Sequence, residues 1–433
     1  MTVTNDELPT DTAVPPRGRL RRLLDRGLEM NALALMATSG ISALFGVVFW
    51  AVAVRYPAAE VGRAAAVLST ATMLGVLSSS AAGLMFARFL GSAGARVRSM
   101  VLVGYGVVTA VAFVLGAGFA LLFAADALFP VAAGRWLFPL LVIVLAWFAL
   151  QDWVLIGMRA ARWVPLEQLA FSGLKLLLLV VFAITMQADG IVLAWALPAA
   201  LGVLVISPLL ARALGKQTHA VDGAVELPSR RGLGVIFLGE YASGVTAVVI
   251  PLLMPLIVVA TLGTEANAYY ALPWLVSEAI TVLLWNISSS YVTEASNDIR
   301  RGGALMRRAF RMSCAVGLLG TPFLLFAAPW LLSLLGGSYA EQGTTLLRVM
   351  AAALPFTIIY STYVAAARVR QQMGRVIALQ VLSGAMVVGL SLLLIGSMGI
   401  VAVGIAYLSM AILNSVIVAV PLWRIFRADK LIR

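Results

Sequence analysis

Long apolar runs recur along this chain, and each is long enough to cross a lipid bilayer as a helix. A hydrocarbon core of about 30 Å needs about 20 helical residues. Twelve runs of this kind are separated by Gly, Pro or charged residues, at 31–54, 61–87, 99–124, 136–158, 164–187, 190–211, 233–261, 268–293, 309–328, 345–367, 374–396 and 399–423. With 62% apolar and 12% charged residues, the chain has too little polar surface for a soluble protein. The sequence therefore predicts an all-α protein that crosses the membrane twelve times.

The distribution of positive charge tests this number of helices. If the N-terminus is cytoplasmic and the helices alternate in direction, 26 of the 31 Lys and Arg residues fall on cytoplasmic connections or tails. The exceptions are Arg55, Arg63, Arg135, Lys175 and Arg348. Membrane proteins concentrate Lys and Arg on the cytoplasmic side, so the asymmetry predicts cytoplasmic N- and C-termini. The net charge of +12 is then explained by loops that face anionic membrane lipids, and we expect no nucleic-acid partner.

Repeated motifs predict that the chain consists of two similar halves. LGAGFALLFAA at 115–125 resembles LGTPFLLFAA at 319–328, AFSG at 170–173 resembles VLSG at 381–384, and SSS occurs at 78–80 and 288–290. Each pair is separated by a little over 200 residues, which indicates an internal duplication. Because six helices is an even number, we expect two six-helix lobes related by a pseudo-two-fold axis along the membrane normal.

The duplication and the apolar runs together predict the domain organisation. The expected parts are a disordered cytoplasmic tail at 1–18, a basic interfacial segment at 19–30, an N-lobe at 31–211, a cytoplasmic inter-lobe loop at 212–232, a C-lobe at 233–424 and a basic cytoplasmic tail at 425–433. The 28 Arg against 3 Lys, with abundant Ala, are typical of a GC-rich bacterial genome. We therefore expect the cytoplasmic (inner) membrane of a bacterium.

Several kinds of chemistry are disfavoured by residue type. With one cysteine, Cys314, and one histidine, His219, the chain has neither an internal disulfide nor a Cys or His metal cluster. It contains no GxxxxGK[ST] motif for nucleotide phosphates. Acidic residues of the outer connections are scattered one per loop, whereas glycan hydrolysis needs a carboxylate pair. We expect no metal, no cofactor and no enzymatic activity.

Four of the expected helices carry polar residues along one face, at the 100° spacing of a helix. These residues are Asn31, Thr38 and Ser42, then Thr72, Ser79 and Ser80, then Glu240 and Ser243, and finally Glu278, Thr281, Trp285, Ser288 and Ser289. The four faces are expected to line one wet substrate cleft. Close helix packing explains any single stripe of small residues equally well.

The acidic residue Glu278 favours the cleft. A charge at the middle of a bilayer costs about 3 kcal/mol on insertion scales, so such a residue faces a cavity, binds an ion or substrate, or stays protonated.

A second pair of charged residues lies within the first half. The helices at 136–158 and 164–187 form a hairpin, with Asp152 about 10 Å and Lys175 about 16 Å from its cytoplasmic edge. A lysine side chain can bridge this distance. A structural ion pair is therefore favoured over a role in substrate binding.

At the eighth helix the sequence resembles a known family. The segment LGTEANAYYALPWLVSEAITVLLWNISSSYVTEASND is similar to the corresponding region of lipopolysaccharide-biosynthesis flippases, which belong to the multidrug/oligosaccharidyl-lipid/polysaccharide exporter superfamily. The matching residues are Gly263, Glu265, Asn267, Ala268, Tyr269, Tyr270, Trp274, Glu294, Ser296 and Asp298, with Pro57, Glu60 and Gly62 in the first half. The resemblance implies a flippase that moves a lipid-linked oligosaccharide or polysaccharide precursor, carried on a polyprenyl diphosphate, by alternating access.

This family often places cations in its cleft, whereas helices 1, 2, 7 and 8 of this chain offer acids there. The hypothesis is that Arg88, with Arg22 or Arg26, captures the diphosphate headgroup at the cytoplasmic mouth. Glu240 and Glu278 would bind the coupling ion, H⁺ or Na⁺, or hydrogen-bond the sugar.

Three alternatives remain open at this point. One is a cation-coupled multidrug exporter of the same superfamily, for which acids that face cationic drugs are natural. The others are a membrane glycosyltransferase or ligase, disfavoured by the short outer loops, and a scaffold for glycan-assembly proteins.

Overall fold

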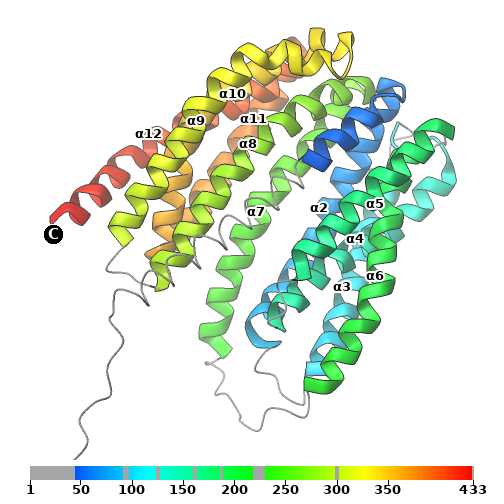
Figure 1. The fold of residues 1–433 in the computed structure, drawn as a ribbon, viewed down its shortest axis with the longest axis horizontal. Helices are drawn as coiled ribbons and strands as arrows, with labels where there is room; N and C mark the ends of the chain where they lie inside the picture. The colour runs from blue at the N-terminus through cyan, green and yellow to red at the C-terminus, as the bar shows by residue number, and fades with distance from the viewer. Residues whose placement is uncertain are drawn as a thin grey trace, which may run out of the picture.

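The structure is a computed structural model that describes residues 44–90, 97–122, 127–158, 163–185, 189–217, 230–297 and 302–431, and these residues form helices and short connections without strands (Figure 1). The helices are Leu44–Ala53, α2 (Ala58–Phe89), α3 (Val97–Leu122), α4 (Ala132–Gly157), α5 (Val164–Thr185), α6 (Gly190–Gln217), α7 (Arg230–Leu262), α8 (Thr264–Asn297), α9 (Gly302–Ser333), α10 (Gly337–Val369), α11 (Met373–Met398) and α12 (Val401–Leu431). The predicted tail at 1–18 and interfacial segment at 19–30 lie outside the described residues.

The prediction of a twelve-helix membrane protein is confirmed. Eleven of the described helices are long and apolar enough to cross a bilayer, and Leu44–Ala53 is the described part of the twelfth. Most helices are longer than predicted: the 34 residues of α8 extend over about 51 Å, well beyond a core of about 30 Å. Hydropathy locates the apolar middle of each helix, and the polar ends that project into the headgroup region continue the same hydrogen-bonding pattern.

The mildly apolar run at 61–87 lies in α2, the central helix of the N-lobe. About 67% of the membrane-spanning window of α2 is buried inside the protein, against 22% for α3 and for α5. In the N-lobe, α2 packs against α3 and α4, while α6 packs against α4 and α5. In the C-lobe, α10 packs against α8, α9 and α12, and α11 packs against α7 and α12. A central helix does not need a lipophilic surface, which explains why α2 gives a weak hydropathy signal.

One arginine in each lobe makes a similar contact with a backbone oxygen of the preceding helix. Arg348 of α10 donates from Nε to the carbonyl oxygen of Leu325 in α9, at 3.0 Å. That carbonyl has no helical partner, because the residue four positions later is Pro329, which lacks an N–H group. In the N-lobe, Arg135 of α4 donates from Nε to a carbonyl in the last turn of α3, where helical partners are also missing. Both lobes thus use an arginine to satisfy a backbone oxygen near the outer end.

The two lobes meet at their outer ends, where α8 crosses α2. Asn267 of α8 donates from Nδ2 to the carbonyl oxygen of Gly62 in α2, at 2.7 Å, and its side chain is fully buried. A Cβ atom at Gly62 would overlap the carbonyl oxygen of Thr264, so this approach requires glycine. Gly62 and Asn267 occupy similar positions near the starts of α2 and α8, as expected for a contact close to a pseudo-two-fold axis.

A hydrophobic cluster with side chains from both lobes surrounds this contact. Phe49, Val61 and Leu68 of the first half pack with Leu272 and Tyr339 of the second. In Figure 1 the two groups of helices converge at this end and diverge toward the opposite end, where α2 and α8 finish. The protein is therefore closed at its outer end in this structure.

Candidate functional site

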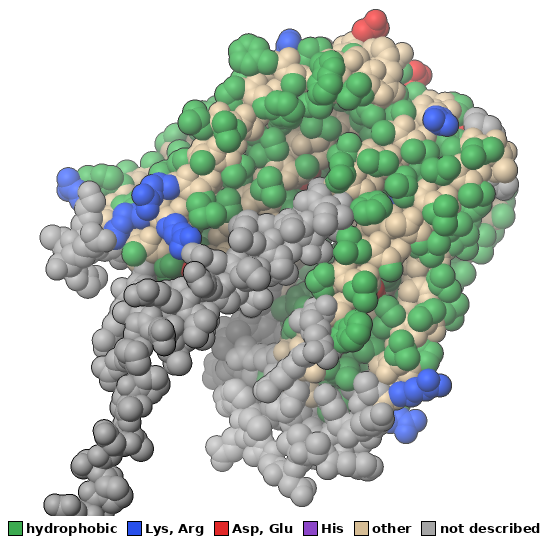
Figure 2. All heavy atoms as spheres, viewed as in Figure 1, with side chains coloured by type: hydrophobic (Ala, Val, Ile, Leu, Met, Phe, Trp, Pro, Cys, Tyr) green, Lys and Arg blue, Asp and Glu red, His purple; other side chains and the backbone are tan. Residues whose placement is uncertain are grey.

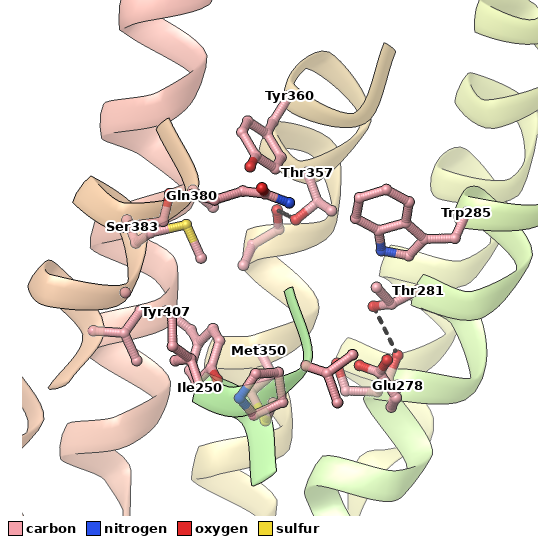
Figure 3. A pocket seen from close by; sticks show the side chains of 18 of the residues that line it. Ile250, Glu278, Thr281, Trp285, Met350, Thr357, Tyr360, Gln380, Ser383 and Tyr407 are labelled. Atoms are coloured by element: carbon pink, nitrogen blue, oxygen red, sulfur yellow. Dashed lines mark hydrogen bonds between the residues drawn. The ribbon is translucent and has the colours of Figure 1, made fainter. Parts of the chain in front are cut away.

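A cavity of about 440 Å³ lies inside the C-lobe, with walls from α7, α8, α10, α11 and α12 (Figure 3). Its aromatic and polar lining residues are Thr246, Trp274, Ser277, Glu278, Thr281, Trp285, Thr357, Tyr360, Arg368, Gln380, Ser383 and Tyr407. A cavity of this size that combines aromatic walls with a few polar groups is typical of a small-molecule site.

The face of α8 that carries Glu278 points into this cavity, which lies within the C-lobe and not in the predicted cleft between the halves. Glu278, Thr281 and Trp285 follow one another at spacings of three and four residues, which places them along one side of the helix. In Figure 3 the three residues follow one another along α8, with Trp285 nearest the level of Tyr360 and Gln380 and Glu278 nearest the level of Met350. Glu278 is 14 residues from the start of α8, which is about 21 Å along a helix of about 51 Å. The carboxylate therefore lies near the middle of the membrane.

Packed aromatic rings lie toward the outer end of the cavity. Trp274 lies between Tyr270, with ring centroids 6.0 Å apart, and Tyr407, at 4.8 Å. The hydroxyl groups of Tyr270 and Tyr407 are buried and have no hydrogen-bond partner in the described part of the chain. Since Tyr407 lines the cavity, its ring forms part of the cavity wall.

The opposite wall is formed by residues outside the predicted site. Gln380 of α11 accepts a hydrogen bond from the hydroxyl of Thr246 in α7, at 3.2 Å. Asn414 of α12 donates to Ser383 of α11, at 2.7 Å. Arg368, near the cytoplasmic end of α10, adds a cation to the lining. A signal for this wall exists in the sequence, because Gln380 and Ser383 share one face of an otherwise apolar run.

The residues predicted to line a shared cleft from α2 do not reach the described cavity. No described residue of α2 lines that cavity. Ser79 is buried, and the hydroxyl of Ser80 donates to the carbonyl of Val76 in its own helix, at 2.6 Å. Thr72 lies half-buried on the same helix. The helix lies between α4 on one side and α7 and α8 on the other, so its small residues serve close packing.

Glycines of the same stripe show this packing directly. A Cβ atom at Gly75 would lie 3.2 Å from the backbone nitrogen of Ala146 in α4, and one at Gly83 would meet the ring of Trp153 at 2.6 Å. The packing interpretation, which the sequence left open, is therefore the one that fits α2.

The other predicted cleft residues fall into two groups. On α8, Ser288 is buried and Ser289 is exposed, and neither lines the cavity, because both follow Trp285, the last residue of α8 that does. Asn31, Thr38, Ser42, Arg22 and Arg26 lie outside the described residues, as do the side chains of Arg88, Glu240 and Ser243.

The predicted ion pair between Asp152 and Lys175 is not formed. The Lys175 ammonium group lies over the ring of Trp195, 3.7 Å from its centroid, and faces two further aromatic rings. Asp152 accepts a hydrogen bond from Gln168 at 3.1 Å, and the buried carboxylate of Glu167 is nearby. Gln168 and Lys175 are seven residues apart on α5, or about 10 Å, so the ammonium group lies deeper in the membrane than Asp152. The aromatic rings stabilise the lysine by cation–π contacts instead.

Solved structures with the same fold are transporters. No family model matches the chain, and no curated protein matches its sequence. An inward-facing multidrug resistance MATE family transporter of the MOP superfamily aligns with a TM-score of 0.66 and 15% identity, over 90% of this chain and 95% of that chain. An outward-facing MATE family transporter of the same superfamily aligns with a TM-score of 0.62 and 17% identity, over 92% of this chain and 95% of that chain.

A third structure is a MOP superfamily transporter from Pyrococcus furiosus, described as having a binding pocket of reverse polarity that suggests a different function. It aligns with a TM-score of 0.63 and 17% identity, over 92% of this chain and 95% of that chain. Identities this low show the fold alone. The chain has the twelve-helix, two-lobe fold of MATE transporters of the MOP superfamily.

Proposed function

We propose that this protein exports amphipathic organic cations by alternating access, and that the C-lobe cavity is its substrate site. The observation that carries the proposal is the placement of Glu278, the one carboxylate among the described residues that line the cavity, in a wall shared with Trp285 and across the cavity from Tyr407. Aromatic faces and a carboxylate attract the same ligand, a hydrophobic group with a positive charge. This favours the multidrug alternative of the sequence analysis, and the solved relatives described as multidrug transporters have the same fold.

The same carboxylate supplies a mechanism for coupling to an ion. A bare carboxylate at the middle of the membrane is costly, so Glu278 needs a proton, a Na⁺ ion or a cationic substrate at every stage of the cycle. If the substrate and the coupling ion compete for the Glu278 carboxylate, binding of the ion releases the substrate and binding of the substrate releases the ion. Closure of the outer end at Gly62 and Asn267 presents the site to the cytoplasm, from which the substrate is taken up.

The lipid-linked glycan flippase remains a second candidate, because the cavity also contains a cation. Arg368 lines the cytoplasmic part of the wall, where it suits the diphosphate of a polyprenyl-linked glycan. In that case Arg22, Arg26 and Arg88 would capture the headgroup, and glycan-assembly proteins would be natural partners. A membrane glycosyltransferase or ligase has no support from the cavity, which offers a single carboxylate among its described lining residues.

Transport in inside-out membrane vesicles tests the proposal. The Glu278→Gln variant keeps the shape of the side chain but cannot attract a cation, and we expect uptake of a fluorescent hydrophobic cation to fall at least about tenfold. Glu294→Gln is the matched control on the same helix: its carboxylate accepts from Ser290 at 3.4 Å and does not line the cavity. Undiminished uptake by the Glu278→Gln variant would refute a cation site there.

The two candidates differ in their dependence on Arg368. For a cation exporter, Arg368→Gln removes a repulsive charge and is expected to leave uptake unchanged or increased. For a flippase, the same variant loses delivery of lipid-linked oligosaccharide to the outer leaflet, which is measured from the sidedness of the glycan in vesicles. Loss of glycan delivery together with normal cation uptake in both variants would select the flippase.

A further inference from the structure

The cytoplasmic end of α9 extends beyond the hydrocarbon core. The helix has 32 residues and is about 48 Å long, whereas the core is about 30 Å thick. Arg311 lies 22 residues, or about 33 Å, from the outer end of the helix at Ser333, and Arg307 lies one turn further. Both guanidinium groups are therefore at the depth of the phosphate groups of the inner leaflet.

These two arginines line an opening of about 390 Å³, together with Ala304 and Phe310. Because they are four residues apart on a helix, their side chains lie on the same face. Nη1 of Arg307 is buried and has no hydrogen-bond partner in the described part of the chain. Two guanidinium groups on one face of a helix provide several N–H donors for an anion at this opening.

Aromatic residues support the same opening from α12. Phe310 packs edge-to-face against Phe426, with ring centroids 5.6 Å apart. One residue further along α12, the guanidinium group of Arg427 lies 3.8 Å from the ring centroid of Trp423. The cytoplasmic ends of α9 and α12 therefore form one basic and aromatic surface.

The surroundings of the opening are strongly positive. Figure 2 shows Lys and Arg side chains gathered at this end of the C-lobe. The described arginines of this region are Arg307, Arg308, Arg311, Arg368, Arg370, Arg375, Arg424 and Arg427. The acidic side chain described at this end, Glu294, is within hydrogen-bond distance of Ser290. Such an excess of positive charge at headgroup depth attracts anionic lipid.

Below the opening, the same face of α9 is apolar. Leu318 follows Arg307 by eleven residues and Arg311 by seven, so all three lie on one side of the helix. Leu318 is about 75% exposed, as a side chain that faces acyl chains should be. The face thus combines a phosphate-binding end with a lipophilic continuation.

We propose that this surface is a binding site for an anionic phospholipid of the cytoplasmic leaflet. The phosphate binds between the guanidinium groups of Arg307 and Arg311, whose N–H groups donate to its oxygens. The acyl chains follow α9 past Leu318. Arginine suits this role because its planar N–H groups pair with two phosphate oxygens at once. The bound lipid would hold the cytoplasmic ends of α9 and α12 together, and this site does not depend on the nature of the transported substrate.

Native mass spectrometry of the purified full-length protein tests the site, with phosphatidylglycerol as the probe. The Arg307→Gln/Arg311→Gln double variant is expected to bind the lipid about tenfold more weakly than the parent protein. Arg98→Gln/Arg212→Gln removes two exposed arginines from the cytoplasmic end of the N-lobe and is the matched control, with unchanged binding expected. An equal loss in both double variants would reduce the effect to general charge attraction and overturn the proposal.

Two further binding measurements identify the class of ligand. Phosphatidylcholine, which has no net charge, is expected to bind no more tightly to the parent protein than to the double variant. Glycerol 3-phosphate is expected to displace phosphatidylglycerol only in large excess, and displacement at equal concentration would mean that the site takes a free phosphate and not a lipid. If the glutamine double variant does not fold, Arg307→Lys/Arg311→Lys keeps the charge but loses the two-oxygen geometry. It should still bind more weakly than the parent, and full binding by it would contradict the proposed contact.

Discussion

At the scale of single residues, the least expected feature is the use of arginines to satisfy backbone oxygens near the outer end of each lobe. The sequence places Arg135 and Arg348 among the few cations away from the cytoplasmic side, but it does not indicate their partners. Their partners follow from helix chemistry: Pro329 frees the Leu325 carbonyl, and the end of α3 frees its last carbonyls. A break in a helix inside a membrane needs such a donor.

The arginine at position 348 gives a prediction for stability. Arg348→Met leaves the Leu325 carbonyl without a donor and is expected to lower the free energy of unfolding by about 1 kcal/mol. In a Pro329→Ala background the backbone N–H at 329 can supply the missing hydrogen bond, so the cost of Arg348→Met should become smaller. Thermal unfolding of the four proteins measures this coupling. Equal costs in the two backgrounds would contradict the proposed pairing.

At the scale of secondary-structure elements, the contact between α2 and α8 decides which side of the molecule is open. The sequence singled out Gly62 and Asn267 through a family resemblance, without a structural reason. The structure gives the reason: because Gly62 has no Cβ atom, the carbonyl oxygen of Thr264 can approach it closely. The carbonyl oxygen of Gly62 in turn accepts the hydrogen bond from Asn267. Which face of α2 would contact which neighbour could not be predicted, because a stripe of small residues fits a cavity and a packed interface equally well.

A methyl group at Gly62 should therefore shift the conformational equilibrium. Gly62→Ala overlaps the Thr264 carbonyl when the outer end is closed, so we expect longer distances between outer labels and shorter distances between cytoplasmic labels on the two lobes. Pulsed electron resonance between spin labels on the lobes measures both. Gly118→Ala in α3, where a Cβ atom has open space, is the control. Unchanged distances in the Gly62→Ala protein would show that this contact does not hold the outer end closed.

At the scale of the whole molecule, hydropathy and charge were enough to predict twelve helices and their sidedness. Each of these signals is a property of a single helix in a bilayer and does not require knowledge of how the helices pack. The run at 61–87, which is confirmed as a membrane-spanning helix, is an example. The proposed site was predicted only in part: the face of Glu278 reaches a cavity, and α10, α11 and α12, which the sequence did not suggest, complete its wall. Which faces meet depends on the packing of six helices within the C-lobe, and single-sequence periodicity does not contain that information.

The sidedness itself can be measured by labelling. In a variant with Cys314 replaced by serine, a cysteine in place of the exposed residue Arg427 should react with a membrane-impermeant maleimide only in inside-out vesicles. A cysteine in place of the exposed residue Glu341 should react only from the opposite side. Reaction of both positions from the same side would be incompatible with the assigned orientation of α10 and α12.

The central claim is that the substrate binds inside the C-lobe, beside Glu278, and not between the lobes. The most direct measurement is a structure of the full-length protein with a bound hydrophobic cation that carries a heavy atom. The account predicts density for that atom within the cavity formed by α7, α8 and α10 to α12, with the positive charge next to the Glu278 carboxylate and the ring of Trp285. Density between α2 and α8, away from this cavity, would contradict it.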